Sequence, residues 1–149
     1  MFSKLPEYLE WANGRTLASM ESIDAPGESL AGVLGHVVAA EEHWFARLGG
    51  GETELANWPK LSLSELRIAI RRNAETCRSI LRSSADRGLT EWIVSYENSS
   101  GERFEQRASD IFMHVFAHGA YHRGQIATAI KRAGGRPAVT DYIAYCRKG

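Results

Sequence analysis

The chain has 149 residues, which is enough for one folded unit whose core needs neither disulfides nor a structural metal. Hydrophobic residues make up 44% of it and charged residues 24%, which excludes a disordered or fibrous protein. The 18 Lys and Arg balance the 18 Asp and Glu, so no net field favours a nucleic acid or an anionic membrane as partner. We therefore expect a single domain over residues 1–149 that binds neither nucleic acid nor membrane.

Cysteine usage and the N-terminus bear on location. The first residues lack the basic start and apolar run of a signal peptide, and no stretch approaches the roughly 18 apolar residues of a membrane-spanning helix. Cys77 and Cys146 lie far apart and in no metal-binding spacing, which is typical of reduced thiols. We expect a cytoplasmic protein.

Apolar residues recur with helical spacing in the first third of the chain. A first helix is predicted from Leu5 to about Met20, and the turn residues 24–27 end its pattern. A second helix is predicted from a Ser29 cap to Leu48, followed by three glycines at 49–51. Its predicted inner face comprises Leu30, Val33, Leu34, His36, Val37, Ala40, Trp44 and Leu48.

A third helix is predicted to begin at Ser62 or Ser64, because Ser62 and Glu65 have the spacing of a capping box. An apolar stripe that includes Asn73 follows, and the helix is expected to fray near residues 86–88.

Between residues 89 and 107 the period changes from helical to alternating, with turn residues at 98–101, which predicts a β-hairpin. A fourth helix is predicted after it, with Ser109 as its cap and its end at residues 133–135. A short helical tail is expected from Thr140 to about Arg147.

Four amphipathic helices must bury their apolar stripes against one another. We therefore predict an all-α four-helix bundle with a small β-hairpin between the third and fourth helices. The connection after the second helix, which contains Trp58-Pro59, can cross an end of the bundle. Together with the hairpin it makes two long connections, which argue against simple up-down-up-down topology.

Three histidines in the fourth helix are the strongest functional signal. His114, His118 and His122 are four residues apart, so their imidazoles stack along one side of successive turns. His118 and His122 lie on or beside the apolar stripe, where two imidazoles need either hydrogen-bond partners or a shared cation. The pair alone is compatible with core histidines or with a metal site. His36 would complete a set of three nitrogen ligands that leaves one position open for water or substrate.

Neighbouring residues have alternative interpretations. His43 and His114 are alternative ligands, or they support the ligands from the core or the surface. Glu41 and Glu42 are either solvated helix charges or groups that orient a ligand or act as a base. Imidazole suits Zn, Ni, Cu and Fe alike, so the spacing does not identify the metal.

Three further side chains of the fourth helix can reach a pocket near the histidines. Tyr121 and Gln125 can hydrogen-bond at its edge. Arg123 either binds an anionic substrate group or makes a packing contact.

Two sequence motifs carry a resemblance to a known family. They are Leu34-Gly-His36-Val-Val-Ala-Ala-Glu41 and His114-Val-Phe-Ala-His118-Gly-Ala-Tyr-His122-Arg-Gly-Gln125. Together with the helix order they resemble the DinB-like family (DinB/YfiT superfamily) of metal-dependent proteins. The resemblance covers nearly the whole chain.

The resemblance implies a four-helix bundle with up-down-down-up connectivity that assembles as a homodimer. It also implies a divalent metal ion, most often zinc or nickel, held by His36, His118 and His122.

The resemblance further implies a small-molecule substrate and a metal-dependent activity. Characterised relatives include transferases and isomerases that use low-molecular-weight thiols such as bacillithiol or mycothiol. A thiol S-transferase is therefore one hypothesis, and a hydrolase that uses the same open site is its neighbour. A non-catalytic, stress-related or metal-sensing dimeric binding module is the alternative, so enzymatic activity stays open at this stage.

Overall fold

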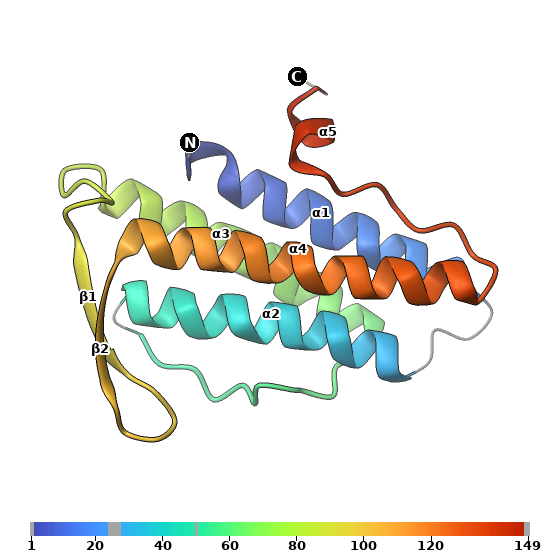
Figure 1. The fold of residues 1–149 in the computed structure, drawn as a ribbon, viewed down its shortest axis with the longest axis horizontal. Helices are drawn as coiled ribbons and strands as arrows, with labels where there is room; N and C mark the ends of the chain where they lie inside the picture. Colours follow the sequence, from blue (N-terminus) through green and yellow to red (C-terminus); the bar gives the residue numbers. More distant parts are fainter. Residues whose placement is uncertain (1, 24–27, 50, 148–149) are drawn as a thin grey trace.

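Four long helices lie side by side in the computed structural model (Figure 1). They are α1 (Leu5–Glu21), α2 (Glu28–Gly49), α3 (Leu63–Ser83) and α4 (Ala108–Arg132). A short 3-10 helix, Phe2–Lys4, precedes α1, and the strands β1 (Ile93–Glu97) and β2 (Arg103–Arg107) form an antiparallel hairpin between α3 and α4. A short helix α5 (Tyr142–Cys146) follows α4. The structure describes residues 2–23, 28–49 and 51–147 and confirms the predicted all-α bundle with its hairpin.

The helices have up-down-down-up connectivity. Helix α1 packs against α3 and α4. Helix α2 also packs against both α3 and α4. Glu7 pairs with Arg78 and Glu21 with Arg67, so α1 and α3 are antiparallel. Figure 1 shows α1 and α4 running in one direction and α2 and α3 in the other. The connectivity implied by the family resemblance is therefore confirmed.

The connection between α2 and α3 runs along the bundle rather than across its end. Because α2 and α3 are parallel, the chain must return over the whole length of α2, as Figure 1 shows. We call residues 51–62 the strap. Side-chain hydrogen bonds that join it to α2 include Thr53 to Glu42 (2.6 Å), His43 to the Leu55 carbonyl (2.6 Å) and His36 to the Asn57 carbonyl (2.7 Å).

The core consists of two apolar clusters separated by a polar layer. The cluster at the hairpin end includes Leu9, Phe45 and Phe112. The cluster at the other end includes Leu34, Leu66 and Ile126. Four buried polar side chains lie between the two along their helices: Asn13, Glu41, Asn73 and Arg123. In the described part of the chain, no helix is both long and apolar enough to cross a membrane.

The buried face of α2 differs in part from the prediction. Leu34, Val37 and Leu48 are buried as predicted. Trp44 is only partly buried, whereas Phe45 is fully buried in its place. The reason is that α2 packs against both α3 and α4, so its buried stripe is broader than the one read from the sequence and is rotated relative to it.

Helix boundaries agree with the prediction where a local cap exists. Ser62 and Glu65 form the predicted capping box, with the Ser62 amide donating to the Glu65 carboxylate at 2.7 Å. The predicted caps Ser29 and Ser109 are wrong, because Ser29 lies inside α2 and Ser109 inside α4. β2 runs directly into α4, and the carbonyls of the preceding chain accept from the first amides of that helix. The predicted turn at 24–27 and the middle glycine of 49–51 lie outside the described residues.

Candidate metal centre

Three histidines from two helices converge on one side of the bundle. His36 comes from α2, and His118 and His122 come from α4, its antiparallel neighbour. One ring nitrogen of each lies within 4.8 Å of the corresponding nitrogens of the other two. Across the described ranges, this is the one such group of at least three histidine, cysteine or carboxylate side chains. The structure therefore brings together the three residues that the family resemblance implies as ligands.

The spacing within the cluster fits a shared cation. The Nε2 atoms of His118 and His36 are 3.2 Å apart. Two nitrogens bound at about 2.0–2.1 Å to one tetrahedral ion are about 3.3–3.4 Å apart, so the observed spacing lies close to that of a zinc-like site. Without a cation, two neutral imidazoles at this distance satisfy each other only if one of them turns a proton toward its neighbour.

Contacts outside the cluster hold two of the rings. The Nδ1 of His36 lies 2.7 Å from the Asn57 carbonyl, and the Nδ1 of His122 lies 2.8 Å from Oε1 of Gln125. A carbonyl oxygen can only accept, so Nδ1 carries the proton in both rings and the Nε2 lone pair is available for a cation. Metal-binding histidines commonly have such an acceptor behind them.

An aromatic side chain of the strap also fixes His36. The ring of Trp58 stacks on the ring of His36 with centroids 4.0 Å apart and planes inclined by 6°. Trp58 is itself 58% exposed, so its position depends mainly on this stacking and on the strap.

His118 is held in its neutral form. Burial, together with the positive charges that His122, His36 and His114 would carry when protonated, lowers the pKa of His118 to about 4. At neutral pH the His118 ring therefore offers a lone pair rather than a charge.

The two alternative ligands lie outside the cluster. His43 is bonded to the Leu55 carbonyl at 2.6 Å and holds the strap. His114 is exposed, and its ring lies 5.5 Å from that of His118 and 5.1 Å from that of Trp44.

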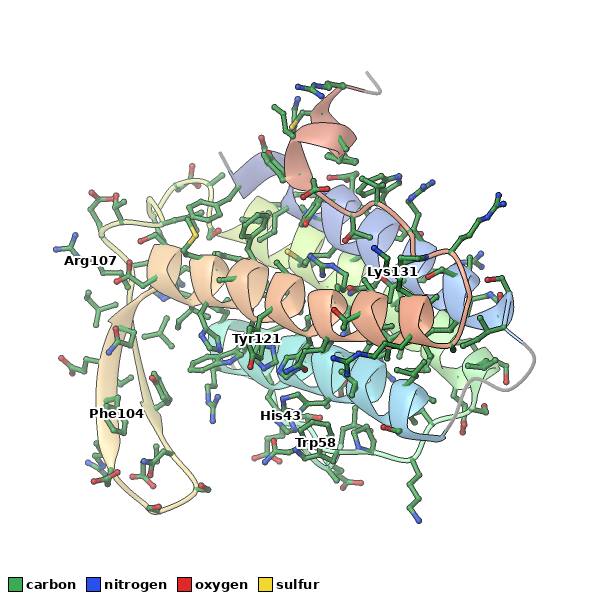
Figure 2. The ribbon with its side chains drawn as sticks, turned by 45° about the vertical axis from the view of Figure 1, so that its right-hand side comes forward. His43, Trp58, Phe104, Arg107, Tyr121 and Lys131 are labelled. Atoms are coloured by element: carbon green, nitrogen blue, oxygen red, sulfur yellow. The ribbon has the colours of Figure 1, made fainter. Side chains whose placement is uncertain are left out.

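The proposed pocket-edge residues differ in their roles. Gln125 bonds to His122, as described above. Tyr121 is 66% exposed, and its ring centroid lies 5.1 Å from that of His122. Figure 2 shows Tyr121 on the edge of α4 that faces the side of the bundle carrying His43 and Trp58.

Glu41 lies in the polar layer of the core and does not face the histidines. It is 2% exposed and accepts from Asn13 (2.8 Å) and Asn73 (3.2 Å). Burial raises the pKa of the Glu41 carboxyl above its usual value, and the two amide donors and the charge of Arg123 offset only part of that rise. Glu42, in contrast, lies nearer the surface and pairs with Arg72.

Arg123 is the cationic partner in the same layer. It is 2% exposed and donates to Oδ1 of Asn13 and to the hydroxyl of Tyr8, both at 2.9 Å. Gly119 makes room for it, since a Cβ there would lie 2.7 Å from Nη1 of Arg123. Arg123 therefore makes a packing contact, and no substrate group can reach it.

Sequence reasoning missed two parts of this arrangement. Asn57 and Trp58 lie in a connection without periodic pattern, so nothing local links them to His36. The polar layer did leave a signal, because Asn13, Glu41 and Asn73 each occupy a position within an otherwise apolar stripe. Buried polar groups in separate stripes are expected to find one another.

The family model described as "DinB family" matches residues 1–148. The chain belongs to the DinB family. Among curated proteins it is similar to "Protein DinB" of Bacillus subtilis (strain 168), with 26% identity over 160 residues that cover 95% of this chain and 91% of that protein. No solved structure matches the chain significantly. The predicted family membership is thus confirmed.

As a member of the DinB family, the chain carries a centre with a definite chemical capacity. Three imidazoles provide nitrogen ligands without a carboxylate, a donor set that suits zinc or nickel better than magnesium or calcium. Three protein ligands leave a tetrahedral ion one position for an exogenous group, which is the pattern of catalytic rather than structural sites.

Proposed function

We propose that this chain is a metal-dependent enzyme that holds a divalent ion, zinc or nickel, through His36, His118 and His122. The observation that carries the proposal is the convergence of three ring nitrogens within 4.8 Å, two of them on rings whose other nitrogen is already bonded to an oxygen. The DinB family membership supports it.

The proposed reaction is the transfer of a low-molecular-weight thiol to an electrophilic substrate. A bound divalent ion lowers the pKa of a thiol that reaches its open position, which makes the sulfur a better nucleophile at neutral pH. In the transfer a sulfur–carbon bond forms, the leaving group departs with its bonding electron pair, and the thiol proton passes to solvent. The histidines bind, and Asn57 and Gln125 orient them.

The sulfur is proposed to come from the substrate and not from the chain. Cys77 is fully buried, and burial raises the pKa of its thiol, so it is a poor nucleophile. Within the described residues the histidine cluster contains no carboxylate, and Glu41 lies in the core. The same ion would also lower the pKa of a bound water, so a hydrolase is the neighbouring possibility. We favour thiol transfer because the characterised relatives implied by the family resemblance use low-molecular-weight thiols.

We also propose a cytoplasmic homodimer. The support comes from the family resemblance and from exposed apolar side chains on α4 and α5, of which Met113, Tyr121 and Ile143 are the largest. Sedimentation of the purified protein tests the assembly, with twice the chain mass expected.

Metal content tests the shared premise of these proposals. We expect about one zinc or nickel ion per chain in purified wild-type protein and in His114→Ala, a control one helical turn away. His118→Ala and His122→Ala are expected to lose most of it. Unchanged stoichiometric metal in both variants would overturn the three-histidine site.

A conjugation assay then separates the function classes. Metal-loaded protein is incubated with bacillithiol or glutathione and an aromatic chloride, and release of chloride is measured. Turnover that is lost in His118→Ala supports the transferase. Full metal loading without turnover for any thiol and electrophile favours the non-catalytic binding module.

A further inference from the structure

A second cluster of side chains lies between the end of α2 and the hairpin. The guanidinium carbon of Arg47 lies 4.5 Å from the ring centroid of Trp44 and 4.9 Å from that of Tyr96. The two rings are nearly perpendicular, with centroids 5.2 Å apart. On the hairpin, Tyr96 is backed by Phe104, whose ring lies 5.8 Å away and whose position Figure 2 labels. The guanidinium of Arg47 therefore lies against the rings of Trp44 and Tyr96, and we call these three side chains the aromatic corner.

Among the residues that the structure describes, no ion pair involves Arg47. The ion pairs of the described residues involve other arginines, such as Arg72 with Glu42 and Arg103 with Glu97. Arg47 is only partly buried, so its N–H groups remain accessible. Stacking on two rings fixes the orientation of a guanidinium. The N–H donors at its edge remain available to a planar anion.

A continuous row of rings connects this corner with the metal centre. The ring of His118 lies 5.5 Å from that of His114, and the ring of His114 lies 5.1 Å from that of Trp44. Arg47 follows His36 by eleven positions on α2. A rise of about 1.5 Å per residue and side chains that tilt toward the helix N-terminus place its guanidinium about 10–15 Å from the histidine cluster. A small organic molecule spans such a distance.

We propose that Arg47, supported by Trp44 and Tyr96, is the subsite for a carboxylate of the substrate whose sulfur reaches the histidine cluster. This inference rests on the proposed function and adds a specificity-determining residue to it. The planar fork of one guanidinium matches one carboxylate in bidentate geometry, and its single positive charge balances the single negative charge of that carboxylate. Substrates with an anionic end at the right distance are therefore selected over neutral ones.

A series of thiols of graded length tests the subsite. The protein is loaded with Co²⁺, and each thiol is titrated while the sulfur-to-cobalt charge-transfer absorption is recorded, which gives a dissociation constant without turnover. The series pairs ω-mercaptoalkanoic acids with ω-mercaptoalkanols of equal length, from three to eleven carbons. For the longer members we expect the acid to bind about tenfold more tightly than the alcohol, and for the shortest we expect no difference.

The variant Arg47→Gln is expected to remove this preference and to leave the affinity for the alcohols unchanged. The matched control is Arg87→Gln, since Arg87 also stacks on a tryptophan, Trp92, at 5.2 Å but lies in the turn before the hairpin. If Arg47 only stacks on the two rings, its substitution changes the stability of the protein but not the ratio of the dissociation constants of the acid and the alcohol.

The outcomes separate the two levels of the proposal. Equal affinity of acids and alcohols at every length, or a preference that survives Arg47→Gln, overturns the subsite and leaves the metal centre standing. Absence of the charge-transfer band with every thiol overturns the proposed thiol chemistry, and the subsite falls with it.

Discussion

Gln125 does more than line an edge, because its side-chain oxygen is the acceptor for Nδ1 of His122 at 2.8 Å. We predict that Gln125→Leu weakens metal affinity by about 10–100-fold, since the ring loses the bond that fixes its orientation and tautomer. Competition with a chelator of known affinity measures the change. Gln106→Leu, on the exposed strand β2, is the control and is expected to bind metal like wild type. Equal affinities in all three proteins would contradict this role of Gln125.

His118 makes the metal-free protein sensitive to acid. Its pKa is about 4 in the folded chain, whereas an unfolded histidine titrates near 6.5. Between these values the unfolded chain holds a proton that the folded chain lacks, so the free energy of unfolding falls as pH drops from about 6.5 toward 4. We predict that wild type loses more stability than His118→Gln between pH 7.5 and pH 5 in urea unfolding. Parallel losses would show that His118 does not contribute.

At the scale of elements, the fit between α2 and the strap sets the position of His36. A Cβ at Gly35 would lie 3.1 Å from the Pro59 carbonyl, whereas a Cβ at Gly32 would meet no atom within 4 Å. We predict that Gly35→Ala displaces the strap, loosens the bond between His36 and Asn57, and lowers metal affinity.

The control for that variant lies on the same helix. Gly32→Ala is expected to stabilise the protein by about 0.5–1 kcal/mol, because alanine favours the helix and nothing opposes it, and to leave metal affinity unchanged. Thermal unfolding and metal titration of both variants check this contrast. A metal affinity that falls equally in the two would show that the fit at Pro59 is not the cause.

The same scale shows what local sequence can predict. Helical periodicity and an alternating stretch gave the four helices and the hairpin, because each pattern is contained within its own element. The Ser62 cap was predictable since both of its partners lie within four residues. The start of α4 was not, because carbonyls of Leu89 and Trp92 bind its first amides across the hairpin. The path of the strap likewise follows from helix directions that no single segment reveals.

At the scale of the whole molecule, the polar layer ties all four long helices together, since Asn73 of α3 also donates to Glu41. Asn13 of α1 bridges Glu41 of α2 and Arg123 of α4, with bonds of 2.8 and 2.9 Å. We predict that Glu41→Leu costs about 3–5 kcal/mol of unfolding free energy, because it leaves the Arg123 charge buried without its counter-charge. The double variant Glu41→Leu/Arg123→Met is expected to be more stable than Glu41→Leu alone.

Glu42 provides a control for the effect of removing a carboxylate from α2. Glu42 pairs with Arg72 near the surface, so Glu42→Leu is expected to change stability by about 1 kcal/mol or less. Denaturant unfolding of the wild type, the two single variants Glu41→Leu and Arg123→Met, their double variant and Glu42→Leu gives the values. Strictly additive effects of the Glu41 and Arg123 substitutions would contradict a coupled layer.

The parts of the candidate site that lie close together in the sequence could be predicted, and the parts that meet only through helix packing could not. His118 and His122 follow from their four-residue spacing on one helix. The residues alone favour His36 but leave His43 open, since the two lie one heptad apart on nearly the same face of α2, and the family resemblance then implies His36. Only the antiparallel packing of α2 against α4 brings His36 to the pair and turns His43 toward Leu55.

The central claim is that His36, His118 and His122 hold one divalent ion. Anomalous diffraction from crystals of the metal-loaded protein, recorded on both sides of the zinc or nickel absorption edge, tests it most directly. The predicted result is a single peak about 2.0–2.1 Å from one ring nitrogen of each histidine. A peak held by His114 or His43 instead, or no peak at the cluster in protein that carries stoichiometric metal, would contradict the claim.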